Sequence, residues 1–272
     1  MNYSNPIGIF DSGIGGLTVV KSIDNSLASE NIIYFGDTAR VPYGSKSNST
    51  VIEYSIQDAK FLLSKNVKLI IVACNTASSV ALSELRSKFD IPVIGMIEPG
   101  AKAAIAASRN RKIGVIGTDA TIANKAYSTE LLKLDASLEI YEKACPLFVP
   151  LAEEGWIDHQ VTKLVAEEYL NELKSQNIDT LILGCTHYPI LKNVIQEVVG
   201  KDVTLIDSGS AASVEVEAYL SGRGIKNTSN NLGSHEYFVS DVPKKFKNIA
   251  ERFLGREVEH VNKVDLETLK II

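Results

Sequence analysis

Short runs of isoleucine, valine and leucine recur along the chain and alternate with segments of helical periodicity. Ile52, Ile56, Ala59 and Leu63 follow one another at helical spacing, which predicts a helix with one face packed on a sheet. Apolar strands that alternate with helices are typical of parallel sheets, so the pattern predicts the α/β fold class. The predicted strands are Ile7–Phe10, Asn31–Phe35, Leu69–Ala73, Val93–Ile97, Lys112–Ile116, Leu138–Tyr141, Thr180–Leu183 and Thr204–Ile206.

The two halves of the chain resemble each other at three landmarks that occur in the same order. The matched pairs are Ile7–Phe10 with Ile113–Ile116, Ile70–Thr76 with Leu181–His187, and Val93–Ala104 with Val203–Ala212. This repetition predicts two similar α/β units related by duplication. If the units face each other with pseudo-two-fold symmetry, the loops after equivalent strands meet in a shared cleft, where open parallel sheets bind ligands.

The chain continues after Asp207 with a segment of helical character at Ala211–Leu220 and a polar, glycine-containing loop at Ser221–Ser234. A final strand is predicted at Glu236–Ser240, and a final helix at Pro243–Leu254.

A cysteine directly follows one predicted strand in each half, within the polar clusters Cys74-Asn75-Thr76 and Cys185-Thr186-His187. Strand ends of this kind face a cleft and lie near helix N-termini, whose partial positive charge can lower a thiol pKa. The alternative is that both are ordinary buried cysteines. Because the duplication places them at equivalent strand ends, we favour a pair of reactive thiols.

Several polar loops follow the same strand ends. The segment Asp11–Gly16 matches neither common phosphate-binding pattern, so we expect its glycines to let the backbone approach a small substrate while Asp11 projects a carboxylate. Asp11 or Ser12 could instead cap a helix. The loop Asp37–Gly44 is either a simple turn or a wall of the cleft. Thr118 and Thr121 add hydroxyl donors from the second unit.

His187 lies two residues after Cys185 and is expected to support that thiol or to protonate a substrate carboxylate, unless it is only structural. A metal site built from Cys74, Cys185 and His187 is disfavoured, because the spacing lacks the paired ligands of zinc sites. Cys145 stands in an apolar stretch without a counterpart in the repeat, which predicts core packing.

Composition narrows the class of protein. The 272 residues are 45% hydrophobic and 22% charged, enough for one large core or two smaller ones. A net charge of -5 gives no reason to expect a basic face, so no nucleic acid is required as a partner. No apolar run approaches the roughly 18 residues of a membrane span, and the start resembles no secretory signal, which predicts a cytoplasmic protein without a membrane partner. Three cysteines, an odd number, are expected as free thiols.

Two thiols on opposite sides of a cleft suit the inversion of a carbon centre. One face must lose a proton while the other receives one, and a thiolate and a thiol can exchange these roles. The developing carbanion also needs hydrogen-bond donors and exclusion of water. The available donors are Ser12, Asn75, Thr76, Thr118 and Thr186.

Four segments, IGIFDSGIGG at Ile7–Gly16, DTARVPYG at Asp37–Gly44, VACNTAS at Val72–Ser78 and LGCTHYP at Leu183–Pro189, resemble the glutamate racemase family over essentially the whole chain. The resemblance implies a homodimer that interconverts L- and D-glutamate without cofactor or metal and supplies D-glutamate for peptidoglycan. It also implies a discontinuous first domain, 1–97 plus 207–272, and a second domain, 98–206, with the active site in the cleft between them.

The resemblance further implies the role of individual residues. Cys74 would act on one face of the substrate and Cys185 on the other, with Asp11 assisting the first thiol and His187 and Glu153 lying near the second. The implied substrate contacts are Asp11, Ser12, Pro42, Tyr43, Gly44, Asn75, Thr76, Thr118, Thr121, Thr186 and His187.

Three other functions stay open at this point. Racemisation of aspartate or another small acid would use the same two-thiol scheme. A two-lobed binding protein would use the cysteines only for packing, and a thiol redox protein is disfavoured because no CxxC motif is present.

Overall fold

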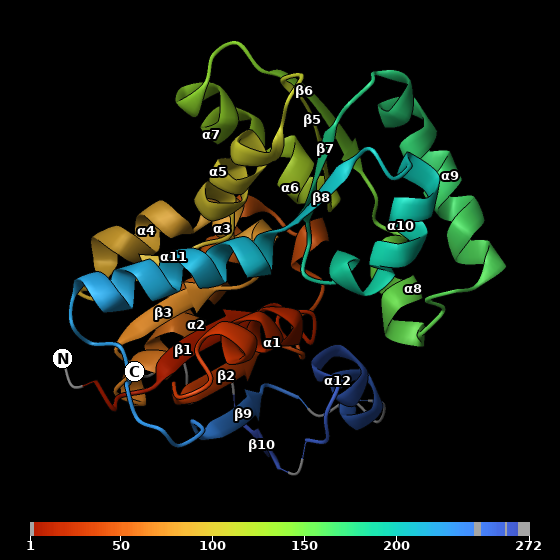
Figure 1. Ribbon diagram of the computed structural model, residues 1–272. Helices are drawn as coiled ribbons and strands as arrows, with labels where there is room; N and C mark the ends of the chain where they lie inside the picture. The colour runs from red at the N-terminus through yellow and green to blue at the C-terminus, as the bar shows by residue number, and fades with distance from the viewer. Residues whose placement is uncertain (1–2, 242–245, 259, 266–272) are drawn as a thin grey trace.

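The computed structural model describes residues 3–241, 246–258 and 260–265 and contains two parallel sheets (Figure 1). The larger sheet has the strand order β10-β9-β2-β1-β3-β4 and the smaller one the order β6-β5-β7-β8. Their bounds are β1 Ile7–Asp11, β2 Ile32–Gly36, β3 Leu69–Val72, β4 Val93–Ile94, β5 Lys112–Gly117, β6 Glu139–Ala144, β7 Thr180–Gly184, β8 Thr204–Asp207, β9 His235–Val239 and β10 Val261–Lys263. All pairs between neighbouring strands are parallel, which confirms the predicted α/β class.

The two sheets repeat one arrangement. The order β2-β1-β3-β4 in the first corresponds to β6-β5-β7-β8 in the second. Their register is also the same, because Gly8 pairs with Ile70 and the equivalent Gly114 pairs with Leu181. The predicted duplication is therefore confirmed at the level of single residue pairs.

Helices connect the strands and cover the sheets. They are α1 Leu17–Ser26, α2 Asn48–Ser64, α3 Asn75–Val80, α4 Leu82–Lys88, α5 Ile97–Ala107, α6 Asp119–Ala123, α7 Ala126–Leu134, α8 Phe148–Glu154, α9 Gln160–Ser175, α10 Lys192–Val199, α11 Ser208–Gly222 and α12 Phe246–Leu254, with short 3-10 helices η1 Tyr43–Ser45 and η2 Tyr188–Leu191. Both faces of the first sheet are buried: Leu69 and Ile71 join one core cluster, and Ile70 and Val72 join another. None of the helices in the described part of the chain is long and apolar enough to cross a membrane.

Some predicted elements differ in detail from the structure. The strand expected at Val93–Ile97 ends at Ile94, and Ile97 already begins α5. The strand expected at Leu138–Tyr141 extends to Ala144, because β6 lies at a sheet edge where charged residues are tolerated. The final helix begins at Phe246 within the described residues, and positions 243–245 of the prediction lie outside them.

Helix α2 is present, and the predicted stripe packs against the core. Ala59 of that stripe is fully buried, and Ile52, Ile56 and Leu63 are partly buried against the same core cluster. The buried face is wider than predicted, because it also includes Val51, Ser55, Asp58, Phe61 and Leu62.

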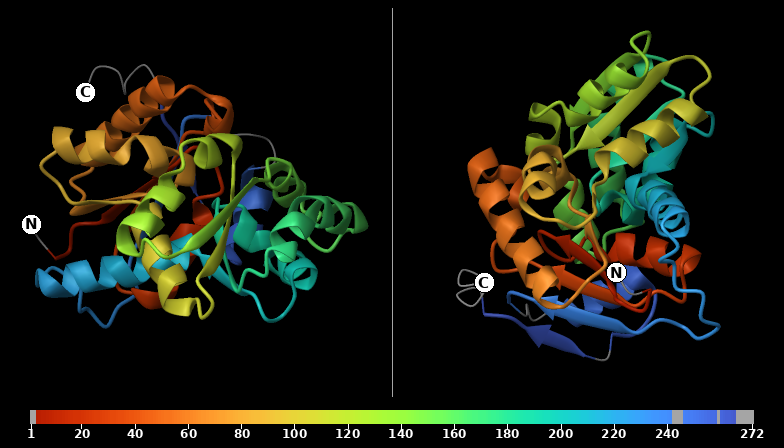
Figure 2. Two further views of the ribbon diagram at one scale, coloured as in Figure 1. Left: turned by 90° about the horizontal axis from the view of Figure 1, so that it is seen from above. Right: turned by 90° about the vertical axis from the view of Figure 1, so that its left-hand side faces the viewer.

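The chain crosses between the units twice. Helix α5 follows β4 of the first sheet but packs against β7 and β8 of the second, and α11 follows β8 but lies along α1 and α5 (Figures 1 and 2). One core cluster runs through both units, since it contains Leu17 from the first and Ile116 from the second. These contacts agree with the proposed domain boundaries, which stay a prediction.

A buried ion pair between Lys68 and Glu30 lies at the end of the first unit that is away from the second. Lys68 is fully buried, and its Nζ lies 2.5 Å from Glu30 Oε2. The same ammonium donates to the carbonyls of Tyr3 at 2.7 Å and Ile225 at 2.9 Å, and Glu30 accepts the Asn227 amide at 2.7 Å. The pair therefore attaches the N-terminal segment and the loop after α11 to the sheet.

Substituting Lys68→Met should lower the free energy of unfolding by about 3–5 kcal/mol, because it leaves the Glu30 carboxylate buried without a counter-charge. Lys102→Met is the matched control. Lys102 pairs with Glu98 and Glu215 but is 49% exposed, so its loss should cost about 1 kcal/mol or less. Urea titration measures both, and equal losses would contradict a structural role for the buried pair.

Candidate functional site

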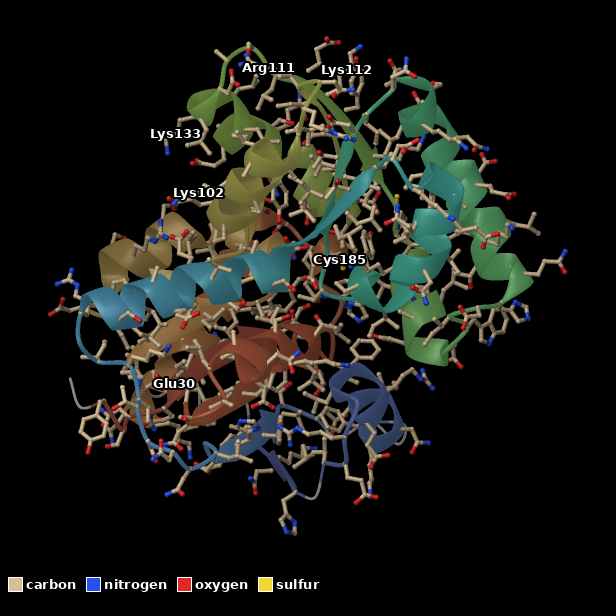
Figure 3. The ribbon with its side chains drawn as sticks, viewed as in Figure 1. Glu30, Lys102, Arg111, Lys112, Lys133 and Cys185 are labelled. Carbon is tan, nitrogen blue, oxygen red and sulfur yellow. The ribbon has the colours of Figure 1, made fainter. Side chains whose placement is uncertain are left out.

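A small cavity of about 190 Å³ lies between the two units and is lined by residues of both. Cys74 at the end of β3 and Cys185 at the end of β7 both line it, each 6% exposed, and Cys185 lies near the middle of the molecule (Figure 3). The full lining is Ser12, Val41, Pro42, Tyr43, Gly44, Ser45, Cys74, Asn75, Thr76, Thr118, Asp119, Pro146, Val149, Pro150, Gly184, Cys185, Thr186 and His187. Larger hollows exist, such as one of about 880 Å³ beside α5 and α11, but its lining contains no cysteine or histidine.

Cys74 is held by hydrogen bonds on both sides. It caps α3, where its Sγ accepts the Ala77 amide at 3.4 Å, and the thiol donates to Ser12 Oγ at 3.6 Å. Burial, and then the charge of Asp11, raises the pKa of Cys74 to about 12 despite these bonds. The amide at the N-terminus of α3 does act to lower the pKa of this thiol, but the loss of solvation outweighs it, so the net shift is upward.

Cys185 has a different neighbour. Its Sγ lies 3.8 Å from His187 Nδ1, and His187 Nε2 lies 3.0 Å from Glu153 Oε1. Burial acts to lower the pKa of His187, but the bonds to Cys185 and Glu153 outweigh it and raise that pKa to about 10. His187 can therefore hold a proton that the Cys185 thiol releases.

Asp11 and Glu153 stand behind the cavity and do not line it. Asp11 is fully buried, and its Oδ2 accepts the Gly13 amide at 3.1 Å. Burial raises the pKa of Asp11, and the nearby His187 opposes that shift. The two carboxylates thus act on the thiols and on His187 from the surrounding layer.

The glycine loop makes room for the opposite unit. A Cβ on Gly15 would lie 2.3 Å from Thr186 Oγ1 and 2.5 Å from His187 Cε1. Thr18, one turn further on, donates to the Thr186 carbonyl at 2.8 Å. The prediction that these glycines admit a substrate is wrong for Gly15, since the side chains of the second unit fill that space.

Three hydroxyls meet across the interface. Thr76 Oγ1 of the first unit lies 2.9 Å from Thr118 Oγ1 and 3.2 Å from Thr121 Oγ1, and the last two are 3.0 Å apart. Thr76 and Thr118 line the cavity, but Thr121 is 1% exposed and does not. Thr121 is therefore placed to orient the other two and not to touch a ligand directly.

Two predicted binding residues that line the cavity have polar groups bonded to other side chains. Asn75 accepts from Tyr127 Oη of the second unit at 2.7 Å and donates to Ser208 Oγ, at the start of α11, at 3.2 Å. The Tyr43 hydroxyl bonds to buried carboxylates behind the loop. The Asn75 amide, which was predicted as a donor, is thus already engaged, and the predicted substrate contacts of Asn75 and Tyr43 stay a prediction.

Helix α12 contributes contacts that the sequence reasoning missed. Arg252 Nη1 donates to the carbonyls of Ala152 at 3.3 Å and Glu153 at 3.0 Å, and the Phe253 ring packs edge-on against His187. These residues are far apart along the chain. The one local signal is Gly155, whose positive φ of 75° and close approach to Arg252 require a glycine.

Other members of the cavity lining were also missed. Pro146, Val149 and Pro150 form an apolar side, and Asp119 follows Thr118 at the start of α6. Among the residues that the structure describes, no group of three or more cysteine, histidine or carboxylate side chains is arranged to hold a metal ion.

Comparison with known proteins identifies the family to which this fold and site belong. Residues 7–216 match the family model described as Asp/Glu/Hydantoin racemase. The chain belongs to this racemase family. A glutamate racemase of Geobacter metallireducens is 50% identical over 264 residues, which is 97% of this chain and 98% of that protein.

Solved structures of family members agree over nearly the whole chain. A glutamate racemase of Francisella tularensis in complex with D-glutamate superposes with a TM-score of 0.91 at 42% identity, covering 98% of this chain and 99% of the other. The isoform RacE1 of Bacillus anthracis gives a TM-score of 0.93 at 40% identity, with coverages of 97% and 99%.

Substituting Gly15→Ala in this racemase should reduce activity by roughly tenfold or more, because the added methyl group displaces Thr186 and His187. Gly222→Ala is the matched control, since a Cβ there meets nothing within 4 Å. Turnover of both variants measures the effect. Equal activities would show that the close approach is unimportant.

The stability that His187 contributes should depend on pH. Its folded-state pKa of about 10 lies above the ordinary value of 6.5, so the contribution is complete below about pH 6.5 and is lost as the pH rises through 10. We expect the difference in unfolding free energy between the native protein and His187→Gln to shrink across this window. Urea titrations at several pH values measure it, and a difference that grows with pH would contradict the assignment.

Proposed function

We propose that this chain is a glutamate racemase in which Cys74 and Cys185 exchange the α-proton from opposite sides of the substrate. The observation that carries the proposal is that both thiols line one small cavity from the two halves of a duplicated fold. The glutamate racemase relatives, one of them bound to D-glutamate, support glutamate over aspartate as the substrate.

The reaction needs one base and one acid at the same carbon. A thiolate on one side takes the α-proton, the C–H bond breaks, and the electron pair stays on the substrate as a carbanion. The thiol on the other side then delivers its proton to the opposite face. The charge moves from one sulfur to the other, so the reverse reaction uses the same residues in exchanged roles.

The surroundings suit the two thiols to different protonation states. Because burial and Asp11 raise the pKa of Cys74 to about 12, Cys74 is the thiol and hence the proton donor. Cys185 can pass its proton to His187, whose cation Glu153 stabilises. Ser12, Thr76, Thr118 and Thr186 supply hydroxyls around the cavity for the developing negative charge.

The remaining roles are assigned by position. Ser12, Pro42, Gly44, Thr76, Thr118, Thr186 and His187 line the cavity and are proposed to contact substrate. Tyr43 and Asn75 are proposed to contribute through their main chain, and Asp11, Thr121 and Glu153 from the surrounding layer. The product would supply D-glutamate for peptidoglycan in the cytoplasm, and the enzyme is proposed to act as a homodimer, which sedimentation can test.

The proposal predicts that L-glutamate dissolved in D₂O exchanges its α-proton and loses optical activity when the enzyme is added without any cofactor. Proton NMR and circular dichroism follow the two events together. L-Aspartate under the same conditions should react far more slowly. Binding of glutamate without exchange would instead indicate a binding protein, and faster exchange of aspartate would reassign the substrate.

Cys74→Ser and Cys185→Ser should each lower racemisation by at least about 10²-fold, because a serine hydroxyl is a poor base at neutral pH. Cys145→Ser is the matched control, since Cys145 is also buried but lies outside the cavity lining. It should keep most of the activity. Full activity in either of the first two variants would rule out the two-thiol mechanism.

A further inference from the structure

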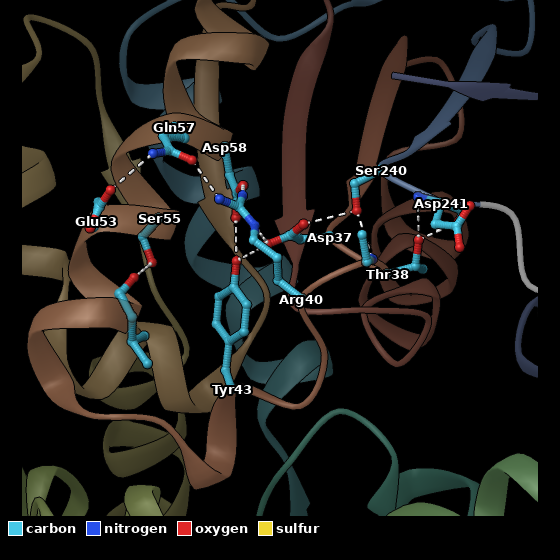
Figure 4. Close-up of polar contacts among 12 residues, drawn as sticks. Asp37, Thr38, Arg40, Tyr43, Glu53, Ser55, Gln57, Asp58, Ser240 and Asp241 are labelled. Carbon is cyan, nitrogen blue, oxygen red and sulfur yellow. Dashed lines mark hydrogen bonds and ion pairs between the residues drawn. The ribbon is translucent and has the colours of Figure 1, made fainter. Parts of the chain in front are cut away.

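The cavity wall formed by Pro42, Tyr43 and Gly44 is anchored from behind by a buried charged network (Figure 4). Asp37 follows β2, and Asp58 lies on the inward face of α2; both side chains are fully buried. The Tyr43 hydroxyl reaches both, with Oη 2.5 Å from Asp37 Oδ2 and 3.0 Å from Asp58 Oδ2.

Arg40 closes the network. Its Nε lies 2.6 Å from Asp37 Oδ2, its Nη2 lies 3.0 Å from Asp58 Oδ1, and its Nη1 bonds to Gln57. The guanidinium also stacks on the Tyr54 ring, 4.0 Å from its centroid. With every nitrogen engaged, Arg40 is fixed in one orientation and holds the two carboxylates together.

Counting hydrogens assigns a proton to the network. The Tyr43 hydroxyl has one hydrogen but faces two carboxylates, so one carboxyl must donate to the phenol oxygen. Asp37 accepts from Arg40, Tyr43 and, through Oδ1, from Ser240 at 2.9 Å, so it is the ionised partner. Asp58, at the longer distance, is the partner that carries a proton.

Electrostatics agree with this assignment. Burial, and then the neighbouring Asp37 charge, raises the pKa of Asp58 well above its ordinary value, although Arg40 opposes the shift. One ionised carboxylate then balances one guanidinium, and no net charge is buried behind the wall.

We propose that Asp37, Arg40 and Asp58 are positioning residues that fix the substrate wall by holding Tyr43 through its hydroxyl. The inference rests on the proposed function for the identity of the ligand. Tyr43 lines the cavity but is 1% exposed, and its hydroxyl is held by the two carboxyl groups behind the loop. Gly44 next to it packs on Thr118 of the second unit, where an added Cβ would lie 2.9 Å from Thr118 Cβ. Movement of Tyr43 therefore changes the width of the cavity.

Tyr43→Phe tests the anchor directly. Losing the hydroxyl leaves two buried carboxyl groups without their shared partner, so we expect KM for glutamate to rise roughly 5- to 100-fold while kcat changes much less. Tyr54→Phe is the matched control, because that ring packs on Tyr43 and Arg40 but its hydroxyl is outside the network. An unchanged KM in Tyr43→Phe overturns the proposal.

Paired amide substitutions test the position of the proton. Asp58→Asn replaces a neutral acid by a neutral amide that can still donate to Tyr43 and accept from Arg40, so KM should stay within about twofold of the native value. Asp37→Asn removes the counter-charge of Arg40 and should raise KM at least as much as Tyr43→Phe. A rise with Asp58→Asn that matches the one with Asp37→Asn overturns the protonation assignment.

Hydrogen–deuterium exchange of the native protein and of Tyr43→Phe gives a readout that needs no substrate. Backbone amides of residues 38–46 should exchange faster in the variant, and those of α9 should not change. Equal exchange in the loop overturns the positioning role. If the native enzyme failed to racemise glutamate, the proposed function would fall while this result still decided the role of the network. Should Asp37→Asn not fold, Tyr43→Phe and Asp58→Asn carry the test.

Discussion

Two thiols line one small cavity from the two halves of a duplicated fold, and the architecture follows from that constraint. A sulfur at the end of a strand can face only the carboxyl edge of its own sheet, so two sheets with facing edges are needed. The repeated order around β1 and β5 supplies them, with Cys74 and Cys185 after equivalent strands. The crossovers through α5 and α11 join the sheets at a shared core, which keeps both edges turned toward one cavity.

The backbone is nearly symmetric, but the electrostatics around it are not. Cys74 has a buried carboxylate behind it, and Cys185 has a histidine backed by a carboxylate. A symmetric pair of thiols would have no preferred location for the single negative charge. In the proposed mechanism the unequal surroundings keep the proton on Cys74 and make His187 the group that carries positive charge beside Cys185. The repeated backbone therefore sets the geometry, and the different neighbouring side chains set the pKa values.

Sequence reasoning succeeded where the signal is local. Strand ends, the duplication and the polar clusters around both cysteines are all visible within short segments, and the fold class follows from them. It failed where tertiary packing determines which residues are buried or in contact. Asp58 was missed because the buried face of α2 is wider than its apolar stripe and extends to polar positions. The contacts of Arg252 and the crowding at Gly15 depend on segments more than 90 residues apart, which only the folded chain brings together.

The charge of the Asp37–Arg40–Asp58 network affects how easily a carbanion forms in the cavity. Glutamate carries two carboxylates and gains further negative charge at the α-carbon during the reaction, so every nearby anion opposes turnover. Asp11 already stands near Cys74, and Asp58 is close enough for the two carboxyl charges to interact. In the proposed assignment Asp58 is protonated and the charge of Asp37 is balanced by Arg40, so the network behind Tyr43 adds no net negative charge beside the cavity. The network can therefore hold the wall of Pro42, Tyr43 and Gly44 in place without a net negative charge that would destabilise the carbanion.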